Sequence, residues 1–577
     1  MKAAIEHLAN RQLDPSLSRA RGRLRFVGCV FAVAFASIAI RLVDMLPEEP
    51  VLREAPAQAA VNPRARPPIL DRNGTLLATD LKVASVYADP SLIRDLEGTA
   101  RKLSQVLVGV EAEPLLRRLR AGKRFAWVKH QITPREEEAV LRLGLPGVAF
   151  QFAEHRVYPK EATASHVVGF VDIDNRGLGG IEYALDSGSL ADRDRTEPLR
   201  LSLDLRVQHA VLDEMRGAMD RFQAVGACGI VMDVRTGELL SMVSLPDFDP
   251  NHVDKAGSEQ RKNRCSGQTY ELGSLFKIFS TAVALDSGRI KISDRFDATR
   301  PLRIGRHTIR DDHAKKRWLS VPEIFMYSSN IGTAKMVFDA GGGEAMKDFL
   351  GRLGLLERGS LEVPELASPQ VPSRWPEVTT ATVSFGHGIA VTPLQFVEAM
   401  ATLSNDGARV RPTLLRVDDP AAVPRTPVVR PEVVDDVRWM MWLTVAEGTG
   451  SRAGVDGYLV GGKTGSADKV DYERGGYRKN AIIASFAGVF PIEDPRYAVL
   501  VMLDEPRGDK GTYGFRYGGW TAAPVVSSII SRAGPLLGVQ PSTREAGEIM
   551  EARRARVLPS AGDKQREKAV AANGAGR

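Results

Sequence analysis

The stretch SLFKIFSTAVALD, residues 274–286, decides what fold we expect from this chain. Apolar residues surround a helix built from it on nearly every side, which indicates a helix that is buried on all faces. Ser274 stands where an N-cap is favoured, and Gly288 follows the last apolar turn, where helices commonly stop. We therefore predict a buried helix from Ser274 to Asp286.

Lys277 is out of place in such a helix. Lysine is almost never fully buried without a partner, and the loss of water around its ammonium lowers its pKa toward values at which a neutral amine accepts a proton. Three positions after Ser274, Lys277 lies on the same helix face and within reach of the serine hydroxyl. Taken alone, an ordinary helix cap and a lysine that reaches solvent explain the pair equally well. The pair becomes a candidate nucleophile and base only in company with further motifs.

A second polar motif, SSN at residues 328–330, falls between two predicted helices. SVPE at residues 320–323 has the pattern of a capping box with proline near the first helical position, so a helix begins there. An apolar helical run follows over residues 331–340 and stops at three glycines. Ser328 and Asn330 then occupy the connection, where polar side chains either project into a cleft or simply cap a helix.

The third motif, KTG at residues 463–465, follows a β-type run at residues 458–460. Side chains alternate along a strand, so Thr464 and Ser466 share one face. Glycines on both sides of the lysine and threonine leave room for another backbone. An extended peptide could lie alongside as an added strand, with Lys463 supplying positive charge for a carboxylate. A glycine-rich hairpin edge is the plainer interpretation of the same pattern.

The three motifs occur in the order found in penicillin-binding proteins and class A β-lactamases. The chain resembles the class B penicillin-binding proteins, and most of all the division-specific septal transpeptidases, over nearly its whole length. Further segments similar to that family are residues 66–74, 156–159, 166, 169–170, 236–238, 263–264, 384–388, 448–449 and 523–524. The chain departs from the family's usual residues at Pro67, Leu272 and Leu275, none of which removes a reactive group.

The resemblance implies an acyl-transfer chemistry. In this family a serine attacks the penultimate D-alanine carbonyl of a peptidoglycan stem peptide and expels the last D-alanine. An amine of a neighbouring stem then resolves the acyl-enzyme, and β-lactams acylate the same serine. The resemblance implies that Ser274 is the nucleophile, Lys277 the base, and Ser328 and Lys463 proton relays. Asn330 would hold the donor amide and Lys277, and the strand with Thr464, Gly465 and Ser466 would bind the substrate. The backbone N–H groups of Ser274 and Ser466 would form the oxyanion hole. No metal or cofactor is implied.

The fold class that we expect is α+β. A serine transpeptidase domain of the penicillin-binding and β-lactamase-like type would pack helices on an antiparallel sheet. Strands are expected at residues 228–234, 238–244, 481–490 and 497–504, with a closing helix over 520–532. The expected segments are a cytoplasmic basic segment (1–25), a transmembrane anchor (26–46), a linker and non-catalytic pedestal domain of mixed structure (47–198), the transpeptidase domain (199–537), and a charged tail (538–577) for which we expect disorder, with a weak charged helix as the alternative.

Residues 26–46 are the one candidate for a membrane span. The uninterrupted apolar core has fifteen residues, which is short. Residues 24–46 reach the roughly 20 residues that a span needs if Arg25 and Arg41 extend toward the interfaces. Basic residues precede the run and acidic residues follow it. We therefore expect a single-pass protein of a bacterial inner membrane, with the N-terminus cytoplasmic and the catalytic domain periplasmic. A cleaved signal peptide is the alternative, favoured by the short apolar core.

Composition agrees with a globular envelope protein. The 577 residues exceed one ordinary domain, and 43% hydrophobic with 26% charged residues excludes a disordered chain. The formal net charge is +7, but no zinc-ligand spacing, RNA-binding signature or helix-turn-helix pattern focuses it, so no nucleic-acid partner is expected. The expected partners are stem peptides and β-lactams and, from the resemblance, a polytopic membrane glycan polymerase and other division proteins.

The three cysteines, Cys29, Cys228 and Cys265, form no metal-binding pattern. In an oxidising compartment, a disulfide between Cys228 and Cys265 is one alternative. A bridge needs a geometry that the sequence does not supply, so two separate buried thiols are the favoured interpretation.

Three other functions stay open beside septal cross-linking. An elongation-type class B transpeptidase would share the anchor, the pedestal and the motifs; residues 41–44 and 517–519 look more like the division type. A non-enzymatic division scaffold would make Ser274 dispensable. A serine β-lactamase shares the motifs, but the long region before the catalytic part and the lack of an assignable deacylating carboxylate argue against it.

Overall fold

The computed structural model describes Phe35, Ser37 and residues 66–122, 124–471 and 474–558. The chain divides into two compact units, Met1–Pro63 and Arg64–Arg577. The cytoplasmic segment, the linker up to residue 65, and the expected anchor apart from Phe35 and Ser37 all lie outside the described residues. Within the described ranges, no helix combines the length and the apolar character that crossing a membrane requires.

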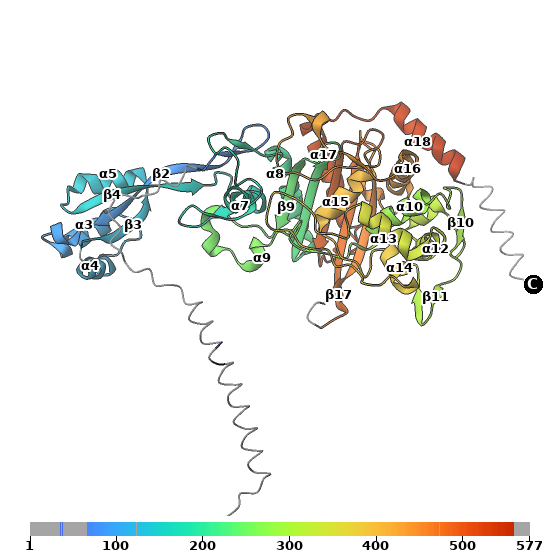
Figure 1. Cartoon of the computed structure of the whole chain (residues 1–577), viewed down its shortest axis with the longest axis horizontal. Helices are drawn as coiled ribbons and strands as arrows, with labels where there is room; N and C mark the ends of the chain where they lie inside the picture. Colours follow the sequence, from blue (N-terminus) through green and yellow to red (C-terminus); the bar gives the residue numbers. More distant parts are fainter. Residues whose placement is uncertain (1–34, 36, 38–65, 123, 472–473, 559–577) are drawn as a thin grey trace, which may run out of the picture. The chain divides into compact units, whose positions relative to one another are not determined.

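The N-terminal part of the second unit is built on β2 (Leu76–Ala88). It pairs with β1 (Ile69–Leu70), β3 (Ala126–Ile132) and β4 (Val148–Val157), and β7 (Leu199–Arg200) completes the five-stranded sheet beside β1. The helices beside it are α3 (Leu96–Val106), α4 (Ala112–Ala121) and α5 (Pro134–Leu143), which share a small apolar core with β2 and β3 (Figure 1). β1 pairs antiparallel with β2 and parallel with β7, so the beginning of the pedestal is joined to the residues that open the catalytic part.

Beside this sheet lies a network of buried charges. Arg66 and Arg156 are 5% and 2% exposed, and Glu182 on α7 (Gly180–Ser187) is fully buried between them. Glu182 accepts from Nε of Arg156 at 2.6 Å and from Nε of Arg66 at 2.8 Å. Asp80 binds Nη1 of Arg156 and Asp186 binds Nη1 of Arg66, while each Nη2 donates to a backbone carbonyl. Each buried cation therefore faces carboxylates, which offsets the desolvation of the charges.

The C-terminal part is built on an antiparallel sheet in the order β16-β17-β18-β8-β9. The strands are β8 (Gly226–Asp233), β9 (Leu239–Leu245), β16 (Gly461–Val470), β17 (Tyr477–Phe490) and β18 (Tyr497–Asp504). Alternate residues of the central strand β18 enter different cores. Val499 and Val501 pack with α8 (Leu205–Phe222) and α17 (Ala522–Leu536), whereas Leu500 and Met502 face the catalytic helices. Burial on both faces explains why β18 is a continuous apolar run.

The catalytic helices cover the second face of this sheet (Figure 1). They are α10 (Lys277–Asp286), α11 (Val321–Tyr327), α12 (Asn330–Asp339), α13 (Gly342–Arg352), α14 (Glu377–Ser384), α15 (Pro393–Thr402) and α16 (Pro431–Glu447). Shorter elements are α6 (Ser165–Val168), α9 (Ser258–Arg261), β5 (Phe170–Val171), β6 (Gly177–Gly179), β10 (Arg295–Asp297), β11 (Leu302–Ile304), β12 (His307–Ile309), β13 (Trp318–Ser320), β14 (Ala408–Arg409) and β15 (Thr426–Pro427). The expected mixed α and β composition is confirmed.

Two predictions for the catalytic part need correction. The β-type run at residues 458–460 lies outside the strand, which begins at Gly461. Tyr458 instead packs against Gly534 of α17 and donates its hydroxyl to the carbonyl of Val539 at 3.1 Å. Cys228 and Cys265, which we expected as separate thiols, form a disulfide with Cα atoms 5.4 Å apart. The arrangement of β8 and the loop before residue 274 supplies the geometry that the sequence could not.

The prediction of a disordered tail is also wrong in part. Residues 544–557 form α18 (Arg544–Val557), while residues 559–577 lie outside the described part of the chain. Arg553 and Arg554 of α18 pair with Asp436 and Glu447 of α16. Met550 and Val557 of the same helix also pack against the main apolar core. A segment whose charges predict disorder in isolation thus gains both ion pairs and apolar contacts with the rest of the chain.

Candidate active site

Ser274 lies in a single 3₁₀ turn, Gly273–Phe276, that leads directly into α10. Gly273 has φ of +54°, and a Cβ atom on it would stand 2.5 Å from the carbonyl oxygen of Ser466. Only glycine fits such a conformation and such a close approach. The turn therefore presses the Ser274 backbone against the middle of β16, and the Ser274 side chain remains half-buried rather than enclosed.

Lys277 occupies the first turn of α10 and is completely buried. Its Nζ donates to Ser274 Oγ at 3.0 Å, to the Ser328 carbonyl at 2.6 Å and Ser328 Oγ at 3.0 Å, and to Asn330 Oδ1 at 2.7 Å. Burial lowers the pKa of this amine to about 7, against the opposing effect of Asp311 and Asp312. An amine that is partly neutral near pH 7 and touches a serine hydroxyl can take up the hydroxyl proton.

Ser328 stands between α11 and α12 in the left-handed conformation, with φ of 60° and ψ of 44°. The sequence explains where α11 begins, because Ser320 and Glu323 form the expected capping box there. The left-handed turn points both the carbonyl and the hydroxyl of Ser328 at Lys277. A non-glycine residue in this region is uncommon and directs attention to function.

Lys463 approaches the same hydroxyl from the opposite side. Its Nζ donates to Ser328 Oγ at 3.0 Å, so that oxygen lies between two lysines. Lys463 is also fully buried, and burial together with the charge of Lys277 sets its pKa well below the ordinary value. Ser274, Lys277, Ser328 and Lys463 are thus joined by an unbroken series of contacts.

The rest of the third motif forms the outer wall of the site. Thr464 Oγ1 lies 2.9 Å from Thr449 Oγ1. Ser466 Oγ donates to the Gly465 carbonyl at 2.8 Å and accepts from Gly518 N at 3.0 Å. A Cβ atom on Gly465 would stand 2.6 Å from the Leu272 carbonyl, so a side chain there has no room. Beside these residues a cavity of about 450 Å³ opens, lined by Asn330, Ser466 and the segment that carries His387.

The structure brings together every residue that the three motifs proposed. Sequence reasoning missed Asp311, which accepts from Ser329 Oγ at 2.7 Å and from the Ile331 backbone N–H at 2.9 Å and so fixes the turn that carries Ser328. Thr449 stood among the family-like segments but received no role. Within the described ranges, no group of three or more His, Cys, Asp or Glu side chains could hold a metal ion.

Comparison with known proteins agrees with this geometry. The family described as penicillin-binding protein transpeptidase domain matches residues 227–531, and the penicillin-binding protein dimerisation domain matches residues 61–182. The probable peptidoglycan D,D-transpeptidase FtsI of Caulobacter vibrioides is 41% identical over 83% of this chain and 82% of its own length. The probable peptidoglycan D,D-transpeptidase PenA of Neisseria gonorrhoeae is 33% identical over 90% and 94%, and the peptidoglycan D,D-transpeptidase FtsI of Escherichia coli is 29% identical over 91% and 93%.

Proposed function

The chain belongs to the class B penicillin-binding proteins of the septal type, and from this premise we propose that it cross-links peptidoglycan stem peptides during division. The observation that carries the proposal is the series of contacts from Ser274 through Lys277 and Ser328 to Lys463. It supplies a nucleophile, an amine that titrates near neutral pH, and a second buried amine to exchange protons with it.

In the acylation step, neutral Lys277 takes the Ser274 proton as Oγ attacks the penultimate D-alanine carbonyl of the donor stem. The C–N bond to the last D-alanine breaks, and Lys277, Ser328 and Lys463 deliver a proton to the departing amine. Such proton transfer contributes on the order of 10² to 10⁴ in rate. The hydrogen bonds from Lys277 to Asn330 and to the Ser328 carbonyl support this role, because they hold Nζ toward Ser274.

The negative oxygen that develops on the donor carbonyl is stabilised by the backbone N–H groups of Ser274 and Ser466. Their proximity is supported by the contact between Gly273 and the Ser466 backbone. One such donor is worth roughly 10² to 10³ in rate. Thr464 and Ser466 bind the donor carboxylate beside Lys463. The donor backbone lies along β16, which Gly465 allows to pack closely against the Leu272 carbonyl.

In the second step, a neutral amine of a neighbouring stem attacks the ester carbon of the acyl-enzyme. The new C–N bond forms, the bond to Ser274 Oγ breaks, and one amine proton returns through Lys277 to the serine oxygen. β-Lactams take the place of the donor stem, since they acylate the same serine and leave it as an acyl-enzyme.

The proposed setting is the bacterial inner membrane at the division septum. Residues 26–46 act as a single anchor with residues 1–25 in the cytoplasm, the pedestal (47–198) carries the transpeptidase domain (199–537) on the periplasmic side, and the anchor meets a polytopic glycan polymerase of the division machinery. The basic residues before the apolar run support this orientation. Recovery of a mature N-terminus after residue 46 would exclude the anchor. Depletion should leave filaments with unfinished septa, whereas swollen cells that still divide would reject the septal role.

Labelled-penicillin capture followed by peptide mapping tests the chemistry. The label should map to Ser274, and Ser274→Ala should abolish it while the protein stays folded, because the change removes one oxygen from a half-buried turn. Full labelling of Ser274→Ala would refute the assignment. Rapid release of hydrolysed penicillin in place of a persistent adduct would indicate a β-lactamase.

A further inference from the structure

A second cavity of about 740 Å³ lies next to the catalytic cleft, and the catalytic contacts do not use it. Asp468 lines both cavities. Glu271 lines the larger one and accepts from the backbone N–H of Gly388 at 3.0 Å, next to His387, which lines the smaller one. The two spaces therefore meet at Asp468, and Glu271 is linked to the wall of the smaller one through Gly388. Glu271 precedes Ser274 by three residues, and Asp468 follows Ser466 by two on the same strand.

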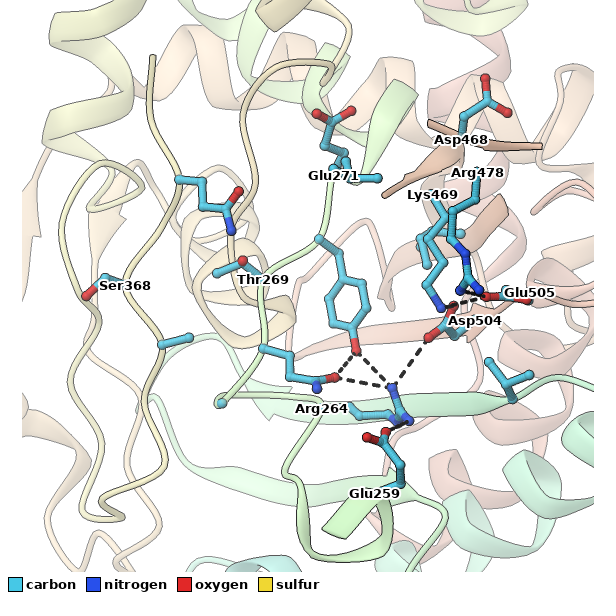
Figure 2. A pocket seen from close by; sticks show the side chains of 18 residues that line it. Glu259, Arg264, Thr269, Glu271, Ser368, Asp468, Lys469, Arg478, Asp504 and Glu505 are labelled. Carbon is cyan, nitrogen blue, oxygen red and sulfur yellow. Dashed lines mark hydrogen bonds and ion pairs between the residues drawn. The ribbon is translucent and has the colours of Figure 1, made fainter. Parts of the chain in front are cut away.

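Most of the charges in the larger cavity are already paired. Arg264 pairs with Glu259 and Asp504, Lys469 pairs with Asp504 and Glu505, and Arg478 pairs with Glu505. Figure 2 shows this paired cluster at one end of the cavity, and the carboxylates of Glu271 and Asp468 at the other. Among the ion pairs of the described residues, neither Glu271 nor Asp468 takes part.

The two remaining carboxylates have different surroundings. Glu271 is 8% exposed, and its two oxygens accept from Gly388 N and from the Tyr477 hydroxyl, both at 3.0 Å. Burial raises the pKa of Glu271 and the nearby Asp468 adds to that effect, whereas the two donors act in the opposite direction and favour the ionised form. Asp468 is exposed and lies on the β16 face that carries Thr464 and Ser466, about 7 Å beyond Ser466 in an extended strand. The larger cavity thus has excess negative charge at the end that opens toward the acyl-enzyme.

We propose that this second cavity is the entry site for the acceptor stem, which it captures as an ammonium ion at Glu271 and Asp468. The inference rests on the proposed function, because that reaction needs an amine to reach the acylated Ser274. The donor already lies along β16, so the amine must enter from another direction. An aliphatic amine is a cation near pH 7, and a cavity of opposite charge raises its local concentration. The captured ammonium releases one proton to solvent and then attacks as the neutral amine.

The test measures how the acyl-enzyme divides between an amine and water. The full-length protein is acylated with a stem-peptide thioester, and transfer to glycinamide, which is cationic at neutral pH, is compared with transfer to hydroxylamine, which is uncharged. Asp468→Asn should raise the glycinamide concentration for half-maximal transfer about fivefold, and Asp468→Lys further, because one charge contact is lost and then reversed. The hydroxylamine concentration for half-maximal transfer should stay within about twofold of the wild-type value, because hydroxylamine carries no charge for the carboxylates to attract.

Two controls separate this inference from its alternatives. Asp348→Asn removes an exposed carboxylate that lines neither cavity and should change nothing. Glu271→Gln should repeat the effect of Asp468→Asn from the other side of the opening. Unchanged glycinamide transfer in both Asp468 variants would overturn the inference, as would an equal loss for both acceptors. A wild-type protein that forms no acyl-enzyme would instead overturn the proposed function, and with it this inference.

Discussion

Two regions of the molecule bury cations, and they do so in opposite ways. In the pedestal, Arg66 and Arg156 are held by the carboxylates of Glu182, Asp80 and Asp186. Burial works against the charge of Arg66, but Glu182 and Asp186 raise its pKa above the ordinary value. In the catalytic part, Lys277 and Lys463 are fully buried, and among the described residues neither lysine forms an ion pair. Lys277 donates to hydroxyl, carbonyl and amide oxygens, and Lys463 donates to hydroxyl and carbonyl oxygens.

The presence or absence of a carboxylate partner distinguishes the structural arginines from the lysines that we propose take part in the reaction. A paired guanidinium stays protonated at every physiological pH and fixes the position of the strands and helix around it. A buried amine without a carboxylate gives up its proton readily. The cost of burying a cation is therefore offset by carboxylates in the pedestal. In the catalytic part it is not offset, and it lowers the pKa of Lys277, which we propose acts as the base.

The largest effect is expected when the unpaired amine is removed. Lys277→Met should lower the rate of penicillin acylation by about 10² to 10⁴, because no other base contacts Ser274 Oγ within the described structure. The free energy of unfolding should not fall by a similar amount, since the variant removes a desolvated cation. Rapid-mixing acylation kinetics and urea denaturation provide the two measurements. Acylation close to wild type would make Lys277 a structural residue.

Breaking the paired network should have the converse result. Glu182→Gln leaves two buried guanidinium groups short of one negative charge, so the free energy of unfolding should fall by about 3 to 5 kcal/mol. Protein that remains folded should acylate at the wild-type rate. The matched control is Glu138→Gln, which breaks an exposed helix pair with Arg142 and should change stability by no more than about 0.5 kcal/mol. Equal effects of the two substitutions would show that the network is not a stabilising centre.

Removing the disulfide tests whether a covalent link stabilises the catalytic part, as ion pairs are expected to stabilise the pedestal. Cys228 and Cys265 are separated by 37 positions, and closing a loop of that size is worth about 2 to 4 kcal/mol. Cys265→Ser should lower the denaturation midpoint, and reducing the wild-type protein should lower it equally. A wild-type protein that is insensitive to reductant would show that the two thiols are not joined.

The last prediction concerns pH. Acylation should rise about tenfold per unit below pH 7 and level off above it, because the reactive form of Lys277 is the neutral amine and its pKa is about 7. Folding lowers this pKa, so the unfolded chain binds more protons between about pH 7 and the usual lysine value near 10.4. The contribution of Lys277 to stability therefore rises with pH across that window and is smallest below it. Lys277→Met should remove that slope, whereas Glu182→Gln should keep it.

Local features could be predicted from sequence. β18 has the expected bounds because an apolar run between turn residues needs no distant information. The contact between Ser274 and Lys277 follows from helix geometry alone. The placement of the motif residues together is visible in the structure, whereas their individual roles stay predictions.

Features that depend on distant partners could not be predicted. The Ser328 carbonyl reaches Lys277 only because one residue adopts a left-handed conformation, and the sequence does not specify that conformation for serine. Glu182 gives no local sign that it will meet Arg66, which lies 116 positions earlier. The pairing of Cys228 with Cys265 depends in the same way on how β8 meets the following loop.

The position of β16 at the end of its sheet has a further consequence, which concerns how the protein avoids sticking to itself. An unpaired strand edge is a template for aggregation, and most proteins cover or interrupt such edges. Here Leu272 and Gly273 press against Gly465 and Ser466 on one side, and Gly518 lies against the Gly465 carbonyl on the other. A whole sheet of another molecule cannot approach a strand enclosed in this way, whereas a single extended chain can. The contacts that leave room for one extended chain therefore also protect this strand edge from pairing with the sheet of another molecule.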